Sequence, residues 1–359
     1  MVAVSPFGVY VHVPFCAARC DYCAFATWTD RPHLMASYAD ACVEEVQAAS
    51  LPPATSVFFG GGTPSLLPAE LLVSVLSAVP RAAGAEVTVE CNPDTVSASL
   101  FAAYRAAGVN RVSFGVQSMA PHVLRGLGRS HDVDHVRTAV RLAGEAGFDS
   151  YNVDLIYGGA GETMADWEAT LAAVLAVDPS PSHVSAYALS VEPGTPLAAD
   201  PARHPDDDDQ ADKYLRADEV LAAAGLRNYE ISNWARPGHE CRHNLLYWSQ
   251  GDYRGIGCAA HSHEQGRRWW NVRTPERYIA AIRSGQSPVA ADETLDDATR
   301  ALERLQLSLR TAAGVPRDAI DDADALTAAD LVHAVAGKRV ALTQRGRLLA
   351  NEVAARLHP

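Results

Sequence analysis

The stretch Tyr10-Val-His-Val-Pro-Phe-Cys-Ala-Ala-Arg-Cys-Asp-Tyr-Cys23 joins an apolar run to three cysteines within eight positions. The residues up to position 13 have the pattern of a β-strand, so the cysteines belong to the loop that follows it. Thiolates are the protein ligands of iron–sulfur clusters, and three of them leave one iron of a four-iron cluster open. The alternative, a structural zinc ion, needs a fourth Cys or His nearby, but position 25 is Phe25 and the next candidate is His33. The pattern therefore favours a [4Fe–4S] cluster. The predicted iron ligands are Cys16, Cys20 and Cys23.

Short apolar runs alternate with helical patterns through the first half of the chain. The predicted strands span 8–13, 57–59, 86–91, 111–117, 150–157 and 183–191, and the predicted helices span 34–49, 69–79, 99–107, 133–146 and 166–177. This alternation predicts βαβ units and a parallel sheet. A closed eight-unit barrel takes about 250 residues, so six units predict either an open, partial (β/α)6 barrel or a doubly wound sheet. In both folds, ligands bind at the carboxyl ends of the strands.

The second half of the chain is less regular. The aspartates at 206–209 predict the start of a helix over about 210–224, because acidic side chains favour the positive helix N-terminus. A metal site is the weaker alternative for these aspartates. The stretch 229–270 is irregular and rich in His, Trp, Tyr and Gly, and the tail is helical and charged with a β-like run at 339–342. We expect a barrel over 1–230, a connecting segment over 231–274, and a small, mainly helical domain over 275–359.

Composition narrows the classes of function. The formal net charge of −13 argues against sequence-independent binding to nucleic acid, which depends on Lys and Arg. No apolar run approaches the roughly 20 residues of a membrane span, and positions 1–10 lack the pattern of a secretion signal. We therefore expect a cytoplasmic protein, in which the seven cysteines form no disulfide framework.

The cysteine spacing Cys-x3-Cys-x2-Cys after the first strand resembles the radical S-adenosylmethionine superfamily. The residues at 10–16 resemble the branch that contains oxygen-independent coproporphyrinogen III oxidases and related haem chaperones, and the resemblance runs almost the full length of the chain. It implies a partial (β/α)6 barrel of the TIM type with a small helical C-terminal domain. It also implies that S-adenosylmethionine binds the iron that has no cysteine. In that superfamily, reduction of the cluster can release a 5′-deoxyadenosyl radical.

The resemblance also assigns residues at the strand ends to S-adenosylmethionine. The segment 60–65 resembles the family's GGGTP segment, in which glycines let the backbone approach a ligand closely. Taken alone, each of the polar residues at the strand ends is more typical of a structural ion pair or hydrogen-bond anchor than of a cofactor contact. The positions that match the family's cofactor contacts are Tyr10, Gly61, Gly62, Thr63, Glu90, Gln117, Arg129, Asp154 and Ala188. One departure is the sequence at 157–161, which lacks the proline of the family pattern and predicts a looser turn.

Three features favour the haem chaperones over the oxidases. The oxidases resemble this chain but carry a further cysteine at the position of Phe25, and they have a longer extension before the cysteines. The segment 242–248 matches the HNxxYW motif typical of the chaperone group. We therefore expect haem binding and transfer to an acceptor protein. The alternatives are radical decarboxylation of coproporphyrinogen III to protoporphyrinogen IX, and a radical enzyme with an unrelated substrate.

The motif defines a predicted haem region. Imidazole is a common ligand of haem iron, and aromatic rings offer flat apolar surface to a porphyrin. The alternative is that these side chains are core aromatics and a turn cap. The motif residues are His243, Asn244, Tyr247 and Trp248, and Cys241, His261 and His263 compete as iron ligands. The resemblance further implies haem as cargo, respiratory acceptors, an electron donor for the cluster, peripheral membrane contact and a homodimer.

Overall fold

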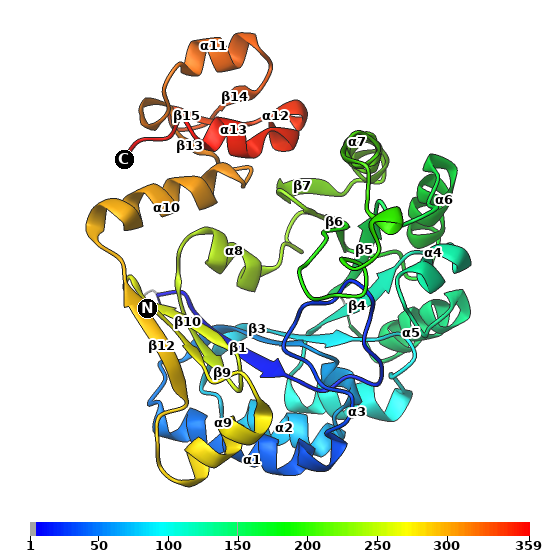
Figure 1. Cartoon of the computed structure of the whole chain (residues 1–359), viewed down its shortest axis with the longest axis vertical. Coiled ribbons are helices and arrows are strands. Elements are labelled where there is room, and N and C mark those ends of the chain that lie inside the picture. Colours follow the sequence, from blue (N-terminus) through cyan, green and yellow to red (C-terminus); the bar gives the residue numbers. More distant parts are fainter. Residues whose placement is uncertain (1–4, 149) are drawn as a thin grey trace.

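The computed structural model describes residues 5–148 and 150–359. Residues 1–4, part of the stretch in which we expect no secretion signal, lie outside the described residues. A curved sheet of 12 strands forms the centre of the fold, and helices cover its outer side (Figure 1). A doubly wound sheet would carry helices on both faces. The predicted α/β class is therefore confirmed in its form as an open, partial barrel.

Six parallel strands build the barrel part of the sheet. They are β1 (Phe7–Val13), β2 (Ala54–Gly61), β3 (Arg81–Cys91), β4 (Arg111–Gln117), β5 (Ser150–Tyr157) and β6 (His183–Ala188). The helices between them are α1 (Met35–Ala48), α2 (Ala69–Ala78), α3 (Ala98–Ala107), α4 (Pro121–Gly126), α5 (Val133–Glu145) and α6 (Met164–Leu175). The six predicted strands and five predicted helices are thus confirmed, while the short α4 was not predicted.

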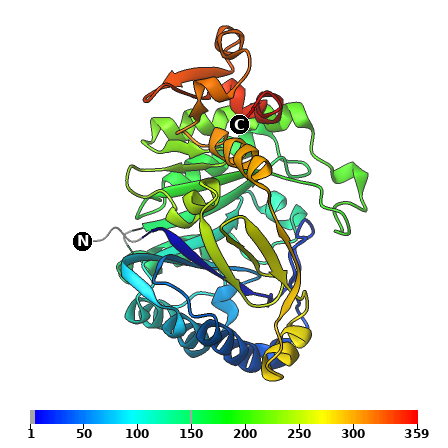
Figure 2. The same ribbon diagram turned by 90° about the vertical axis from the view of Figure 1, so that its left-hand side faces the viewer.

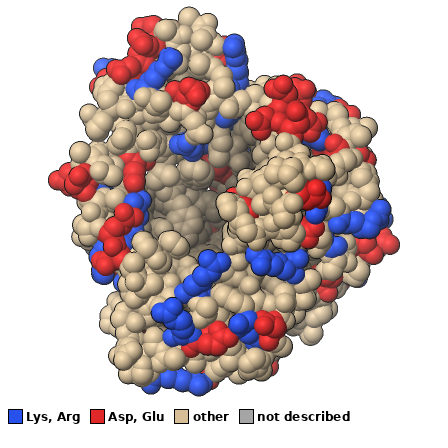
Figure 3. All heavy atoms as spheres, viewed as in Figure 1, with Lys and Arg blue, Asp and Glu red and all other residues tan. Residues whose placement is uncertain are grey.

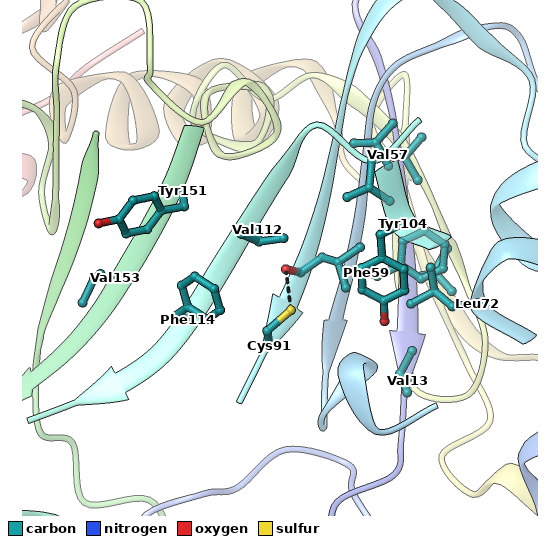
Figure 4. Packing of buried hydrophobic residues seen from close by; sticks show 14 of the residues in the cluster. Val13, Val57, Phe59, Leu72, Cys91, Tyr104, Val112, Phe114, Tyr151 and Val153 are labelled. Carbon is teal, nitrogen blue, oxygen red and sulfur yellow. Dashed lines mark hydrogen bonds between the residues drawn. The ribbon is translucent and has the colours of Figure 1, made fainter. Parts of the chain in front are cut away.

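The two faces of the barrel strands differ in polarity. Apolar side chains at alternate positions pack under the outer helices, as Figure 4 shows for Val57, Phe59, Val112, Phe114 and Val153. Polar side chains occupy the positions between them and line the inside, among them Thr88, Glu90, Arg111, Ser113, Asn152, Asp154, His183 and Ser185. Successive side chains of a strand point to opposite faces. The sheet therefore separates an apolar layer under the helices from a polar interior.

The helix α7 (Asp207–Ala223) begins within the aspartate run. The side chain of Asp206 accepts a hydrogen bond from the amide of Asp209 at 2.9 Å, which is the geometry of an N-cap. The prediction of a helix start at these aspartates is confirmed, and the helix begins a few residues earlier than predicted.

The sheet continues beyond the barrel strands on both edges. Next to β6 lie β8 (Asn233–Ala235) and β7 (Arg227–Glu230), both antiparallel. Next to β1 lies β9 (Asp252–Ile256), which is parallel to it and is followed by antiparallel β10 (His261–Glu264), β11 (Arg267–Asn271) and β12 (Val289–Thr294). Figure 2 shows this part of the sheet in yellow. The stretch 229–270 is thus more regular than expected, and the domain boundaries stay a prediction.

The C-terminal part has a hydrophobic core of its own, which includes Leu309, Val315, Val340 and Val353. Its helices are α10 (Asp297–Leu309), α11 (Ala323–Ala328), α12 (Gln344–Leu348) and α13 (Ala350–Ala354), after α9 (Pro275–Arg283). Its sheet consists of β13 (Val315–Pro316), β15 (Arg339–Leu342) and β14 (Val332–Val335). The β-like run predicted at 339–342 is confirmed as β15. Among the described residues, no helix combines the length and the apolar character that crossing a membrane requires.

Candidate functional site

The loop after β1 carries the three cysteines to the carboxyl ends of the barrel strands. Two backbone hydrogen bonds close its base, from the amide of Cys16 to the carbonyl of Trp28 at 3.1 Å and from the amide of Trp28 to the carbonyl of Pro14 at 2.8 Å. All three thiols are free and partly exposed. Together with the strand ends they line one cavity of about 650 Å³. The geometry therefore places three soft ligands beside a space large enough for a small molecule.

Two polar groups approach the cysteine sulfurs. The hydroxyl of Thr63 lies 3.7 Å from the sulfur of Cys16, and Nη1 of Arg129 lies 3.4 Å from the sulfur of Cys20. Burial raises the pKa of the Cys16 thiol, and the hydrogen bond from Thr63 acts in the opposite direction; the thiolate is the form that binds metal. Across the described residues, no three His, Cys, Asp or Glu side chains converge as they would around a single metal ion. The ligands of a four-iron cube bind different irons and need not converge on one point.

The glycine segment after β2 packs directly under the cysteine loop. A Cβ atom on Gly62 would lie 2.7 Å from the carbonyl oxygens of Val13 and Phe15, so only glycine allows this approach. Gly61 has a φ of +106°, a backbone conformation that favours glycine. The amides of Gly61, Gly62 and Thr63 are all used within the protein, by Glu90 Oε2, the carbonyl of Val13 and the carbonyl of Phe15. The segment therefore offers a ligand its carbonyl oxygens rather than its amides.

Two carboxyl groups face the cavity from inside the barrel. Asp154 accepts hydrogen bonds from Ser113 Oγ at 2.8 Å and from Asn152 Nδ2 at 2.7 Å, which supplies the partners that a buried carboxyl needs. Burial and the nearby charge of Asp154 raise the pKa of Glu90 to about 8. Burial also raises the pKa of Asp154. The cavity therefore contains two carboxyl groups that a cationic ligand would favour in their ionised forms.

The raised pKa of Glu90 predicts a pH dependence of stability. In the folded protein the Glu90 carboxyl keeps its proton up to a pKa of about 8, whereas in the unfolded chain it loses the proton near its ordinary pKa of 4.5. The free energy of unfolding should therefore fall as pH rises from about 4.5 to about 8. In Glu90→Gln this contribution is absent, and the fall between about pH 5 and about pH 8 should be smaller. Urea unfolding of the metal-free protein across this range measures the difference. An equal dependence of the free energy of unfolding on pH in the wild type and Glu90→Gln would contradict the raised pKa of Glu90.

Arg129 and Gln117 also line the cavity. Nη2 of Arg129 donates to Asn92 Oδ1 and to the carbonyl of Gly115, both at 2.8 Å. Its Nε atom is buried and has no partner among the described residues. Gln117 has a φ of +66° at an irregularity in the pairing of β4 with β5. Strained backbone at a strand end is a common way of aiming a side chain at a site.

The structure brings all but one of the predicted cofactor residues to this cavity. The lining includes Gly61, Gly62, Thr63, Glu90, Gln117, Arg129, Asp154 and Ala188 together with the three cysteines. Tyr10 lies instead in two adjoining spaces, a polar cavity of about 180 Å³ inside the barrel and an open cleft of about 530 Å³. Asn92 and Tyr187 also line the main cavity and were missed. Asn92 directly follows a strand, and that position was the available signal.

The HNxxYW motif lies on α8 (Arg242–Trp248), which packs inside the barrel against β1 and β2. His243 is completely buried, and its two ring nitrogens lie 2.9 Å from Ser56 Oγ and 2.8 Å from the hydroxyl of Tyr247. Burial lowers the pKa of His243 to about 3. Asn244 and Tyr247 line the polar cavity with it, whereas Trp248 lines neither this cavity nor the open cleft. The geometry at His243 fits the alternative in which this side chain has a structural role in the core. The role of the motif in haem binding stays a prediction.

The open cleft adjoins the cofactor cavity. It is lined by Tyr10, His12, Ala24, Phe25, Ala26, Gly61, Tyr247, Tyr253, Ala259, His261 and Arg273. Figure 3 shows that this face of the molecule is hollowed near its centre, where Figure 1 draws α8 beside the loop after β1. Ala24, Phe25 and Gly61 line both spaces. A ligand in the cleft would therefore lie against the cysteine loop.

Comparisons with known proteins agree with this architecture. Residues 10–174 match the radical SAM superfamily. The heme chaperone HemW of Mycobacterium tuberculosis strain H37Rv is 43% identical, with 97% of this chain and 94% of that protein covered. The heme chaperone HemW of Escherichia coli K12 is 39% identical, with 73% and 71% covered. The solved structure of coproporphyrinogen III oxidase (HemN) from Escherichia coli, a radical SAM enzyme, is 22% identical with a TM-score of 0.83, covering 98% of this chain and 89% of that one. The last similarity shows a shared fold.

Proposed function

This chain belongs to the HemW family within the radical SAM superfamily, and from that premise we propose that it is a haem chaperone, which binds haem and passes it to an acceptor protein. The observation that carries the proposal is the similarity to heme chaperones over nearly the whole chain, at 43% identity. Phe25, which stands where the resembling oxidases have a cysteine, supports the same choice. The alternative is an oxygen-independent coproporphyrinogen III oxidase, for which the likeness to the solved oxidase supports only the fold.

Membership of the superfamily implies a [4Fe–4S] cluster and S-adenosylmethionine. The donor set of the cavity fits both groups, because thiols line one part of it and carboxyl, guanidinium and carbonyl groups line the rest. When bound, the cluster would supply one-electron chemistry to the cofactor beside it. The residues that would hold the cluster are Cys16, Cys20 and Cys23.

The charges around the cavity match those of S-adenosylmethionine, which carries a sulfonium, an amino group and a carboxylate. Arg129 would pair with the carboxylate, since a guanidinium can bind it through two nitrogens and Nε of Arg129 is unpartnered within the described chain. Glu90 and Asp154 would accept from the amino group or the ribose hydroxyls. Carbonyl oxygens of the glycine segment would complete the amino site, because its amides are occupied. Tyr10 would reach the cofactor from the two adjoining spaces that it lines.

Further partners belong to the same proposal. They are respiratory haem acceptors, an electron donor for the cluster, a second copy of the chain and a membrane surface contacted from the cytoplasm. The segments 1–230, 231–274 and 275–359 are its proposed domains. The partners follow from the family resemblance, and the domain bounds follow from the sequence pattern.

The proposed function is tested on anaerobically reconstituted protein supplied with reductant and S-adenosylmethionine. One portion is titrated with haem, and another is given coproporphyrinogen III and analysed for vinyl products. We expect stoichiometric haem binding and no decarboxylation. Formation of protoporphyrinogen IX would establish the oxidase instead, and the absence of haem binding would refute the chaperone.

A further inference from the structure

The sequence predicted four candidate ligands for the haem iron, and the structure separates them by access. Cys241 is 2% exposed and its thiol lies 3.6 Å from Glu86 Oε1. His243 is buried with both ring nitrogens engaged. His263 is 4% exposed, with Nδ1 2.9 Å from the carbonyl of Gly251. None of these three lines the open cleft, whereas His261 does.

His261 is held in place by its neighbour on β11. It is the first residue of β10 and pairs with Trp270, and the two rings stack with centroids 5.6 Å apart and an interplanar angle of 26°. The imidazole is exposed, and within the described chain neither of its nitrogens has a hydrogen-bond partner. A stacked ring with free nitrogens is pre-oriented for a ligand, because little rotamer freedom is lost when the ligand binds.

The rest of the cleft has the chemistry of a porphyrin. The rings of Tyr10, Phe25, Tyr247 and Tyr253 contribute to its walls, and flat aromatic surface suits a flat apolar macrocycle. Phe25 is 64% exposed and lines the cleft, so its ring is accessible to a ligand there. The volume of about 530 Å³ lies within the roughly 300–1,000 Å³ usual for small-molecule sites.

A cation lies at the same cleft. Arg273 is exposed and lines it, and this guanidinium forms no ion pair among the described residues. The carboxylates of haem propionates are the groups that a guanidinium binds through two parallel hydrogen bonds. His12 also lines the cleft, but its Nε2 lies 2.9 Å from the carbonyl of Ala26 and its Nδ1 lies 3.3 Å from the hydroxyl of Tyr10, so both ring nitrogens already have partners.

We propose that this cleft is the haem site, that His261 is an axial ligand of the haem iron and that Arg273 binds a propionate. The proposal rests on the proposed haem-chaperone function and goes beyond it by locating the cargo. It places the haem against the cysteine loop, because Ala24, Phe25 and Gly61 separate the cleft from the cofactor cavity.

The ligand assignment is tested by titrating reconstituted wild type and His261→Ala with haem, followed by absorption and by low-temperature electron paramagnetic resonance. We expect the variant to bind haem at least roughly tenfold more weakly, with a changed Soret band that added imidazole restores. The control is His333→Ala, which removes another exposed imidazole from β14 and should leave binding unchanged. Because His261 is exposed, its loss should not disturb the fold, and an unchanged cluster absorbance checks this.

The outcomes separate this inference from the function on which it rests. If wild type binds haem and His261→Ala shows the same spectrum and affinity, the ligand assignment is overturned while the chaperone function stands. If wild type binds no haem, the function itself fails. For Arg273→Glu we expect weaker binding of haem but unchanged binding of haem dimethyl ester, which lacks free propionates. An equal loss for both compounds would overturn the role of Arg273.

Discussion

Replacing Cys20 with serine is expected to abolish the iron–sulfur absorbance of the anaerobically reconstituted protein. Among the described residues, the cysteine loop brings three thiols to the cavity. Loss of one would leave the cluster with two protein ligands, and iron–sulfur clusters are held by cysteine thiolates. The sulfur of Cys20 also accepts from Nη1 of Arg129 at 3.4 Å, so the substitution also removes the sulfur acceptor of this hydrogen bond. The same result is expected for Cys16→Ser and Cys23→Ser. Absorption spectra and iron and sulfide contents per chain measure the loss.

The matched control is Cys91→Ala. Cys91 borders the same cavity, but its thiol points to the carbonyl of Val89 at 3.6 Å and lies in the apolar layer drawn in Figure 4. The Cys91→Ala variant should keep a full cluster, because the change removes only a small buried side chain. A full cluster in Cys20→Ser, or loss of the cluster in Cys91→Ala, would contradict the assignment of the three ligands.

The barrel could be predicted from the sequence because its determinants are local. Each strand carries apolar residues at alternate positions, such as Val87 and Val89 of β3, and each strand is followed by a helical pattern. The placement of the cysteines, the glycine segment and Glu90 at one edge then follows from the parallel order of the strands. Chemistry that depends on strand ends is therefore visible in the sequence.

Features set by long-range packing were not predictable in this way. The segment Arg267–Asn271 has no apolar alternation, and β12 is almost entirely exposed, so their pairing depends on the sheet edge that β1 offers. The burial of His243 depends on where α8 docks, since its partner Ser56 is 187 positions away. His261 and His263 lie two positions apart on β10 and point to the same face of the sheet. Their different exposure depends on the neighbours of each, the carbonyl of Gly251 for His263 and the ring of Trp270 for His261. In each case a residue's role depends on a partner distant in sequence.

The second large expected effect concerns a buried ion pair behind the turn after β5. The side chains of Lys213 on α7 and Glu162 are both completely buried, and the Lys213 ammonium lies 3.2 Å from Glu162 Oε2. The ammonium also donates to the carbonyl of Glu162 at 2.8 Å and to Asp209 at 2.6 Å. Glu162 in turn accepts from the amide of Gly158 at 2.7 Å. This ion pair therefore orders the turn at 157–161, which the sequence predicted to be loose because it lacks a proline.

Lys213→Met is expected to lower the free energy of unfolding by about 3–5 kcal/mol, because it leaves the buried Glu162 carboxylate without its cation. Adding Glu162→Gln should recover most of that loss, since a buried pair replaced on both sides by neutral groups of similar size is often tolerated. Asp209→Asn should cost much less, because the Asp209 side chain is 40% exposed and water can replace its partner. Urea denaturation of the wild type, Lys213→Met, Glu162→Gln and the double variant measures the coupling as a double-mutant cycle, and Asp209→Asn is measured beside them. If the double variant is no more stable than Lys213→Met, uncompensated charge is not the cause, and Lys213 stabilises the protein mainly through its hydrogen bond to the Glu162 carbonyl.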